Sequence, residues 1–215
     1  MVCSAGRGVA RSYPQRPVEV PMSIEEDLRK ADERPDDVIA AVLRDHAEIK
    51  GLFADVSSAK SVDAKKDAFR RLVRKLVVHE TAEQEVVHPL IRGADTRAAS
   101  VVEKRLDEEK EAEAALAELG ELDISSADFD SRLAALQADV VEHAEAEEEQ
   151  EVPLLDEKVD AKRLRQLAPV FRVAENTAPT RPHPEGPTSA VGNIAIGPFL
   201  SIADRVRDAI RDVRE

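Results

Sequence analysis

Two segments of the chain repeat one chemical spacing, a histidine followed four positions later by a glutamate: His79 with Glu83, and His143 with Glu147. On an α-helix, residues four apart lie on one face, one turn apart, so both side chains can reach a single metal ion. A third histidine, His46, lies in an upstream segment with similar apolar neighbours. The spacing therefore predicts helices that carry metal ligands on their inward faces.

Apolar residues recur at three- and four-residue steps through four long segments, which is typical of amphipathic helices. Acidic or serine caps, prolines and glycines mark most of the ends. The predicted helices span residues 36–58, 61–91, 96–119 and 127–157. Long helices joined by short loops predict an all-α fold, an antiparallel up-and-down four-helix bundle with an irregular C-terminal extension.

This bundle is expected to occupy residues 36–157 of the 215. Residues 1–35, rich in Arg, Pro and Ser, are expected to be a flexible N-terminal tail or an upstream start choice, and a more helix-like phrase begins at Met22. The segment 158–198 combines a short helix with a proline-rich linker, and His183 in that linker is expected to be structural or exposed. Residues 199–215 show the apolar spacing of a C-terminal amphipathic helix.

The chain carries 44 acidic against 31 basic side chains, a net charge of -13. This balance argues against nucleic acid and anionic membranes as partners, because both bind basic surfaces. The single cysteine, Cys3, provides neither an intramolecular disulfide nor a thiolate metal site. No run of about 18 apolar residues and no signal-peptide core occurs, so we expect a cytoplasmic protein.

A lone histidine on an apolar face is more often a packed core residue than a ligand, but here three of five histidines lie on the inward stripes of three helices. Burying Glu83 and Glu147 is strongly unfavourable unless each charge is paired, and no Lys or Arg lies nearby on those stripes. A cation supplies the missing charge. Imidazole with carboxylate and no thiolate suits iron, manganese or zinc, and the number of donors favours two metals that share bridging carboxylates.

The order of His46, the segment His79–Glu83 and the pair His143 and Glu147, each pair followed by an acidic run and a proline, carries a resemblance. Over residues 36–157 the chain resembles the hemerythrin HHE cation-binding family. The resemblance implies a four-helix bundle that holds two non-haem iron ions with carboxylate or oxo bridges. It also implies that oxygen, nitric oxide or peroxide meets this di-iron centre.

One departure concerns the third helix, where many members of that family have a histidine and this chain has none between Leu106 and Glu111. His88 is the nearest substitute in the bundle segment. It follows His79 by nine residues, about 180° around a regular helix, so a π-bulge or a broken last turn must bring it to the site.

Glu80, about 100° from His79 on a helix, is a candidate bridging ligand, and Glu109 or Glu113 is the alternative on the third helix. The predicted metal ligands are His46, His79, Glu80, Glu83, His88, His143 and Glu147.

The segment His79–Glu83 also resembles the His-Glu-x-x-His motif of zinc peptidases, but Glu83 occupies the position of the second histidine. Two functional classes remain: a device that binds or senses oxygen or nitric oxide, and an enzyme that consumes peroxide or nitric oxide. Because carboxylate-rich ligation stabilises ferric iron, we expect peroxide or nitric oxide handling rather than oxygen transport. A metal-free or iron-storing helical interaction protein is the alternative, and in its metal-free form His79→Ala would be almost silent.

Overall fold

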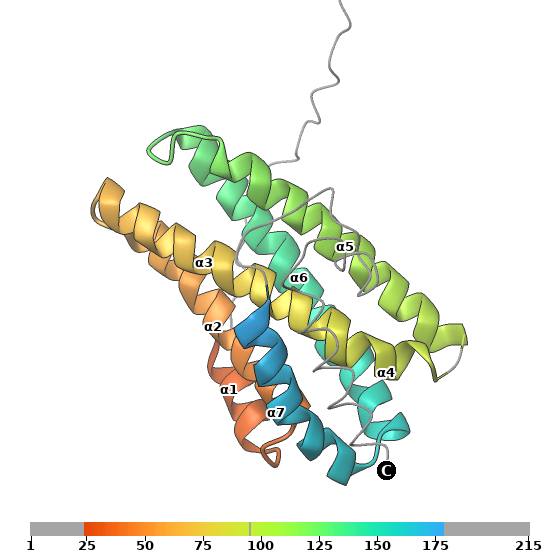
Figure 1. The fold of residues 1–215 in the computed structure, drawn as a ribbon. Helices are drawn as coiled ribbons and strands as arrows, with labels where there is room; N and C mark the ends of the chain where they lie inside the picture. Colours follow the sequence, from red (N-terminus) through yellow and green to blue (C-terminus); the bar gives the residue numbers. More distant parts are fainter. Residues whose placement is uncertain (1–23, 95, 179–215) are drawn as a thin grey trace, which may run out of the picture.

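The computed structural model describes residues 24–94 and 96–178, and the regular elements in these ranges are all helical (Figure 1). They are α1 (Ile24–Asp32), α2 (Val38–Ser58), α3 (Val62–Ala82), the π-helix η1 (Glu83–Val87), α4 (His88–Arg92), α5 (Thr96–Gly120), α6 (Ala127–Lys158) and α7 (Ala161–Thr177). Because α3, η1 and α4 follow one another without a gap, they form one long rod. The all-α prediction is confirmed.

Four rods form the predicted bundle: α2, the α3–η1–α4 rod, α5 and α6. Figure 1 shows α3 beside α2 and α5 beside α6, and α4 packs against both α5 and α6. Three of these four rods begin at side-chain caps, because Asp37, Ser61 and Ser126 each accept a hydrogen bond from a backbone N–H three residues further on. The observed bounds differ from the predicted ones by at most two residues.

Buried apolar residues form two separate clusters along the bundle. The loop-end cluster lies towards the α2–α3 and α5–α6 connections, and its largest members are Phe53, Leu72, Leu76, Leu119, Phe129 and Leu136. The α7-end cluster gathers residues of α2, η1, α4, α6 and α7, including Ile39, Ile91, Leu155, Leu167 and Phe171. Along α2 the α7-end cluster stops at Leu43 and the loop-end cluster starts at Ile49, so a layer that belongs to neither separates them.

The prediction of a flexible tail over 1–35 is wrong for residues 24–32, which form α1 and pack on α2. Ala31 is buried, and the buried Asp27 accepts a hydrogen bond of 2.6 Å from the ammonium of Lys50. A nine-residue helix is unstable alone in water, so these tertiary contacts explain why it forms here. Residues 1–23 lie outside the described part of the chain.

The short helix predicted within 158–198 is α7, and it packs on α2 and α3 as part of the interior. Leu167, Phe171 and Ala174 of this helix are completely buried. The predicted linker beyond residue 178, His183 and the predicted helix 199–215 lie outside the described residues. None of the described helices is long and apolar enough to cross a membrane.

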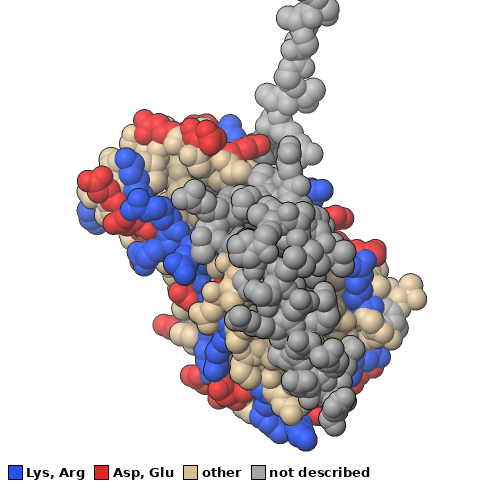
Figure 2. All heavy atoms as spheres, viewed as in Figure 1, with Lys and Arg blue, Asp and Glu red and all other residues tan. Residues whose placement is uncertain are grey.

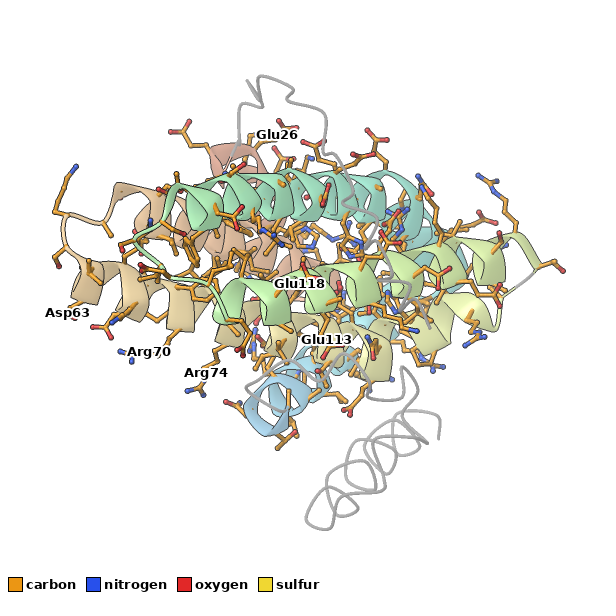
Figure 3. The ribbon with its side chains drawn as sticks, turned by 90° about the horizontal axis from the view of Figure 1, so that it is seen from above. Glu26, Asp63, Arg70, Arg74, Glu113 and Glu118 are labelled. Carbon is orange, nitrogen blue, oxygen red and sulfur yellow. The ribbon has the colours of Figure 1, made fainter. Side chains whose placement is uncertain are left out.

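Most charged side chains lie on the outside of the bundle. Lys and Arg gather along α3 on the face shown in Figure 2, and Figure 3 shows Asp63, Arg70 and Arg74 pointing away from the interior. Charged groups at the surface keep their hydration, so they need no structural explanation. The buried polar residues between the two apolar clusters do need one.

Candidate metal centre

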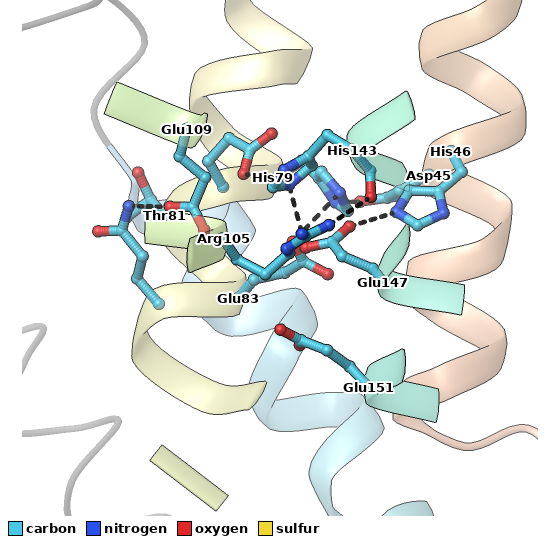
Figure 4. A network of polar contacts seen from close by, with 12 residues as sticks. Asp45, His46, His79, Thr81, Glu83, Arg105, Glu109, His143, Glu147 and Glu151 are labelled. Atoms are coloured by element: carbon cyan, nitrogen blue, oxygen red, sulfur yellow. Dashed lines mark hydrogen bonds and ion pairs between the residues drawn. The ribbon is translucent and has the colours of Figure 1, made fainter. Parts of the chain in front are cut away.

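The layer between the two apolar clusters is made of imidazoles and carboxylates. His46 of α2, His79 of α3 and His143 of α6 are 2%, 2% and 7% exposed, and Figure 4 shows them converging with Glu147. Each histidine lies on the apolar stripe of its helix, so the packing that buries the stripe also buries the imidazole. The three helices therefore bring together histidines that lie far apart in the sequence.

The two predicted histidine–glutamate pairs meet as their spacing requires. Nε2 of His79 lies 3.4 Å from an oxygen of Glu83, and Nε2 of His143 lies 3.1 Å from Oε1 of Glu147. The other oxygen of Glu147 lies 3.2 Å from Nε2 of His46. Glu147 therefore faces imidazoles of two helices, one with each oxygen, which is the arrangement of a bridging carboxylate.

The described residues contain three groups of possible metal ligands, and each residue offers one donor atom to its group. Within each group, all donor atoms lie within 4.8 Å of one another. The first donor group is His46, His79, Glu83 and Glu147; the second is Glu80, Glu83 and His143; the third is His88, Glu109 and Glu147. Glu83 is common to the first and second groups. Two ions in these groups would therefore share a carboxylate.

The three imidazoles of the first and second groups direct their other ring nitrogen, Nδ1, at a carboxylate outside the groups. The pairs are His46 with Glu148 at 3.1 Å, His79 with Asp45 at 3.2 Å, and His143 with Glu108 at 3.0 Å. A proton held on Nδ1 by such a carboxylate leaves the lone pair of Nε2 free to bind a metal. The rings are therefore oriented as metal ligands commonly are.

Each of these outer carboxylates is held in turn by a cation. The ion pairs are Glu148 with Lys30 at 2.6 Å, Asp45 with Lys75 at 2.6 Å, and Glu108 with Arg105 at 3.1 Å. Burial raises the pKa of Asp45, but the hydrogen bond with His79 and the charge of Lys75 outweigh it and lower the pKa to about 2. The outer carboxylates therefore stay ionised at neutral pH.

The inner donor atoms lack such partners. Nε2 of His46 and His143 and both oxygens of Glu147 are buried without a hydrogen bond. Burial raises the pKa of Glu83 well above its ordinary value, and the charges of Glu147 and Glu80 raise it further. Unpaired buried donors of this kind are unfavourable unless a cation binds them, so the residues present fit a metal ion.

Sequence reasoning missed one cation in this layer, Arg105 of α5, which is completely buried. Its guanidinium donates to the backbone carbonyl of His143 at 3.4 Å and to Glu108 at 3.1 Å. Arg105 thus supports His143 from outside and does not pair with the inner carboxylates. A buried arginine depends on the rotation of its helix, which local sequence does not reveal.

The predicted residues on the neighbouring turns also reach the layer. The π-helix η1 provides the wide turn that His88 requires, and His88 is 3% exposed. An oxygen of Glu80 lies 3.7 Å from Nε2 of His143, so Glu80 faces the imidazole of α6. Glu109 belongs to the third donor group, whereas Glu113 belongs to none of the three.

Sequence reasoning did not identify Asp45, Glu108, Glu148 or Glu151. Glu151 follows Glu147 by four residues on α6, a signal that would have found it, and one of its oxygens lies 3.6 Å from Nε2 of His88. The other three flank predicted residues in the chain but serve imidazoles of other helices. Their role depends on the tertiary arrangement.

Two small cavities border the layer, each with a volume of about 10 Å³, room for about one water-sized molecule. One is lined by His46, His79, Glu80 and His143 together with Ile49 and Phe53. The other is lined by Glu83, Glu147 and Glu151 together with Val38, Ile39 and Val42. Both combine donor residues with apolar walls.

Comparison with known proteins is consistent with this chemistry. The sequence model of the hemerythrin HHE cation binding domain matches residues 37–155, a range that contains the three donor groups. An uncharacterized hemerythrin-like protein of Schizosaccharomyces pombe (strain 972 / ATCC 24843) is 22% identical over 169 residues, which cover 78% of this chain and 83% of that protein. No solved structure matches the chain.

Proposed function

Because the chain belongs to the hemerythrin HHE cation-binding family, we propose that it is a non-haem di-iron protein that handles oxygen, peroxide or nitric oxide. The observation that carries the proposal is the adjoining pair of buried donor groups that share Glu83. His46, His79 and Glu147 complete one group, and Glu80 and His143 complete the other. One iron in each group gives the buried carboxylates the positive charge that they lack.

The choice of iron follows from the donor set and the family. Imidazoles and carboxylates without a thiolate suit iron, manganese or zinc, and the carboxylate-rich composition favours the ferric state. When bound, the iron pair supplies the electron-transfer chemistry towards a small oxidant or nitric oxide. Stabilised ferric iron binds oxygen less reversibly, so we favour peroxide or nitric oxide handling over oxygen transport.

The chain itself orients the ligands and excludes water. The outer carboxylates Asp45, Glu108 and Glu148 hold a proton on Nδ1 of each imidazole, which fixes the ring and keeps Nε2 directed inwards. The two apolar clusters close the layer from both sides. The cavities beside the donors admit molecules of about the size of water, which suits a diatomic ligand or peroxide better than a larger substrate.

Metal analysis with an optical spectrum tests the proposal. Protein purified from iron-supplemented cells is expected to contain two iron ions per chain and to show oxo-bridged ferric absorption, which is easy to see because the chain has no Trp and one Tyr. Glu147→Gln should lose most of the iron, whereas Glu149→Gln, an exposed change on the same helix, should retain it. Colourless wild-type protein without a transition metal would overturn the proposal.

Steady-state assays separate the two functional classes. Consumption of peroxide or nitric oxide by the iron-loaded protein, abolished in Glu147→Gln, indicates an enzyme. Nitric oxide binding without turnover indicates a sensor or carrier instead. If His79→Ala changes neither metal content nor stability, the metal-free interaction protein replaces both.

A further inference from the structure

A surface pocket of about 420 Å³ lies beside the connection between α6 and α7, at one end of the bundle (Figure 1). Its lining residues come from η1, α4, the end of α6 and the start of α7, and none of them belongs to a donor group. Pockets that bind small organic molecules usually have volumes of about 300 to 1,000 Å³. This pocket is therefore large enough for such a molecule, unlike the two cavities of about 10 Å³ beside the donor layer.

One part of the pocket is an apolar wall formed by Val86, Pro89, Leu90 and Val159. Val86 and Val159 are buried members of the α7-end cluster, and Leu90 packs against that cluster. The same packing that forms the core therefore holds the wall in place before any ligand binds. A wall of this kind favours a ligand with a hydrocarbon part, because covering it removes apolar surface from water.

The other part of the pocket contains the guanidinium of Arg163, which has no partner among the described residues. Its Nε is buried without a hydrogen bond. In Arg105, whose Nε is also unpaired, the two remaining nitrogens donate to Glu108 and to the carbonyl of His143. Arg163 makes no such donation to the described part of the chain. A buried donor without a partner is an exception in folded proteins, and it points to a ligand or water that accepts from it.

The charged residues of the lining are two cations, Lys158 and Arg163, and one carboxylate, Asp160. Asp160 caps α7, and its Oδ1 accepts a hydrogen bond of 3.0 Å from the backbone N–H of Arg163 rather than from the guanidinium. Lys158 lies 2.8 Å from Glu157, an exposed residue outside the lining. The pocket therefore has an excess of positive charge, and this excess favours an anionic ligand.

We propose that this pocket binds a small organic carboxylate, with the carboxylate on Arg163 and the hydrocarbon part against Pro89, Leu90 and Val159. The Nε and one terminal nitrogen of a guanidinium form a planar fork that matches the two oxygens of a carboxylate. Inorganic phosphate also fits such a fork, but it would leave the apolar wall exposed to water. The site is independent of the proposed function, because it uses no metal donor.

Calorimetric titration of the full chain with phenylacetate tests the site, because this probe joins a carboxylate to an apolar ring. We expect one binding site per chain. Phenylacetamide, which has the ring without the charge, and inorganic phosphate, which has the charge without the ring, should each bind at least tenfold more weakly. Wild type that does not bind phenylacetate would overturn the proposal. Phosphate that binds as tightly as phenylacetate would overturn the assignment to an organic carboxylate.

Variants locate the site within the pocket. Arg163→Met should weaken phenylacetate binding at least tenfold, and Arg163→Lys should weaken it less, because it keeps the charge and loses the fork. Arg165→Met, at an exposed position two residues further along α7, is the matched control and should bind as the wild type does. Circular dichroism verifies that each variant is folded. Unchanged affinity in folded Arg163→Met would overturn the proposal. If that variant does not fold, Ala94→Phe decides, because it narrows the pocket without altering its charge, and unchanged binding would again overturn the site.

A carboxylate probe can also bind a metal ion, so the titration is made on metal-free and on iron-loaded protein. Equal affinity in the two forms and an unchanged ferric spectrum are expected, because the pocket and the donor groups share no residue. Binding that occurs only in the iron-loaded form would place phenylacetate on the metal and overturn the pocket. Protein that holds no iron would contradict the proposed function alone, since the metal-free titration still decides this site.

Discussion

The loop-end cluster and the donor layer are built by the same four rods, yet they meet opposite physical requirements. Side chains such as Phe53, Leu72 and Phe129 gain stability simply by leaving water. Carboxylates such as Glu83 and Glu147 lose hydration when the same helices bury them. The comparison teaches that burial alone stabilises the loop-end cluster, whereas the layer beside it buries carboxylates whose charge the proposed metal ions would balance.

Metal removal should have the largest effect and should act on one region only. Stripping iron with a chelator under reducing conditions is expected to lower Tm by about 10 °C, because metal binding contributes free energy to folding. Hydrogen exchange should speed up in residues 79–88 and 141–151 and stay slow around Phe53 and Phe129. Equal loss of protection in both regions would break the comparison.

A cavity in the loop-end cluster should have the opposite effect: it should destabilise that cluster and leave metal binding unchanged. Leu72→Ala removes a completely buried side chain and is expected to lower the free energy of unfolding by about 2 to 5 kcal/mol. The folded fraction should still bind two iron ions, as metal analysis after gel filtration will show. Val62→Ala, at an exposed position of the same helix, is the control and should change stability little. Loss of iron in folded Leu72→Ala would show that the two regions are coupled.

Removing a lysine or arginine that pairs with an outer carboxylate should have a smaller effect on iron binding, limited to the donor group that this carboxylate supports. Lys75 holds Asp45, which holds His79, and it also contacts Glu175 of α7 at 2.9 Å. Lys75→Met is expected to weaken iron binding about tenfold, a typical cost of losing an outer-shell partner. Lys75→Arg should restore part of the affinity, and Lys66→Met, exposed on the same helix, should leave it unchanged. Competition with a coloured chelator measures each affinity.

The effect of pH on folding stability should be the smallest, and it should have opposite signs in metal-free and iron-loaded protein. Although burial lowers it, the carboxylates of Glu147 and Glu148 beside the two ring nitrogens raise the pKa of His46 to about 9, and burial raises that of Glu151 to about 8. Folded metal-free protein therefore holds protons that the unfolded chain releases, and its stability should fall as pH rises from about 6.5 to about 8.5. Iron-loaded protein should gain stability over the same range, because protons compete with the metal. Melting curves of both forms at the two pH values check this, and slopes of equal sign contradict it.

The sequence predicted those parts of the fold that depend on local pattern. The four rods have long apolar stripes and clear caps, so their bounds follow from periodicity. Helix α1 has only nine residues, and its position depends on the contact between Asp27 and Lys50. Helix α7 was expected as a short helix, but its place in the interior depends on the faces of α2 and α3.

The candidate site divides in the same way. The pairs at His79 and His143 were predictable because residues four apart on a helix share a face, and the structure brings them together with His46. Their role as metal ligands stays a prediction. Arg105 and the outer carboxylates were not predictable, because each contacts a side chain or carbonyl group of another helix. The position of His88 depended on a deviation from regular helix geometry that local propensity does not reveal.

That deviation has a consequence for how chains of this kind can diverge. In η1 the N–H of His88 donates to the carbonyl of Glu83, five residues back, so this turn contains one residue more than an α-helical turn. Because the π turn absorbs this extra residue, a chain with one residue fewer between these two positions can form a regular α-helical turn and keep everything beyond it in the same phase. A chain of the same length with a regular α-helix here would instead turn His88 and Ile91 by about 100°, and His88 would leave the interior. Homologues that are one residue shorter here are therefore expected to have a regular turn in place of η1 and to keep the same donors directed inwards.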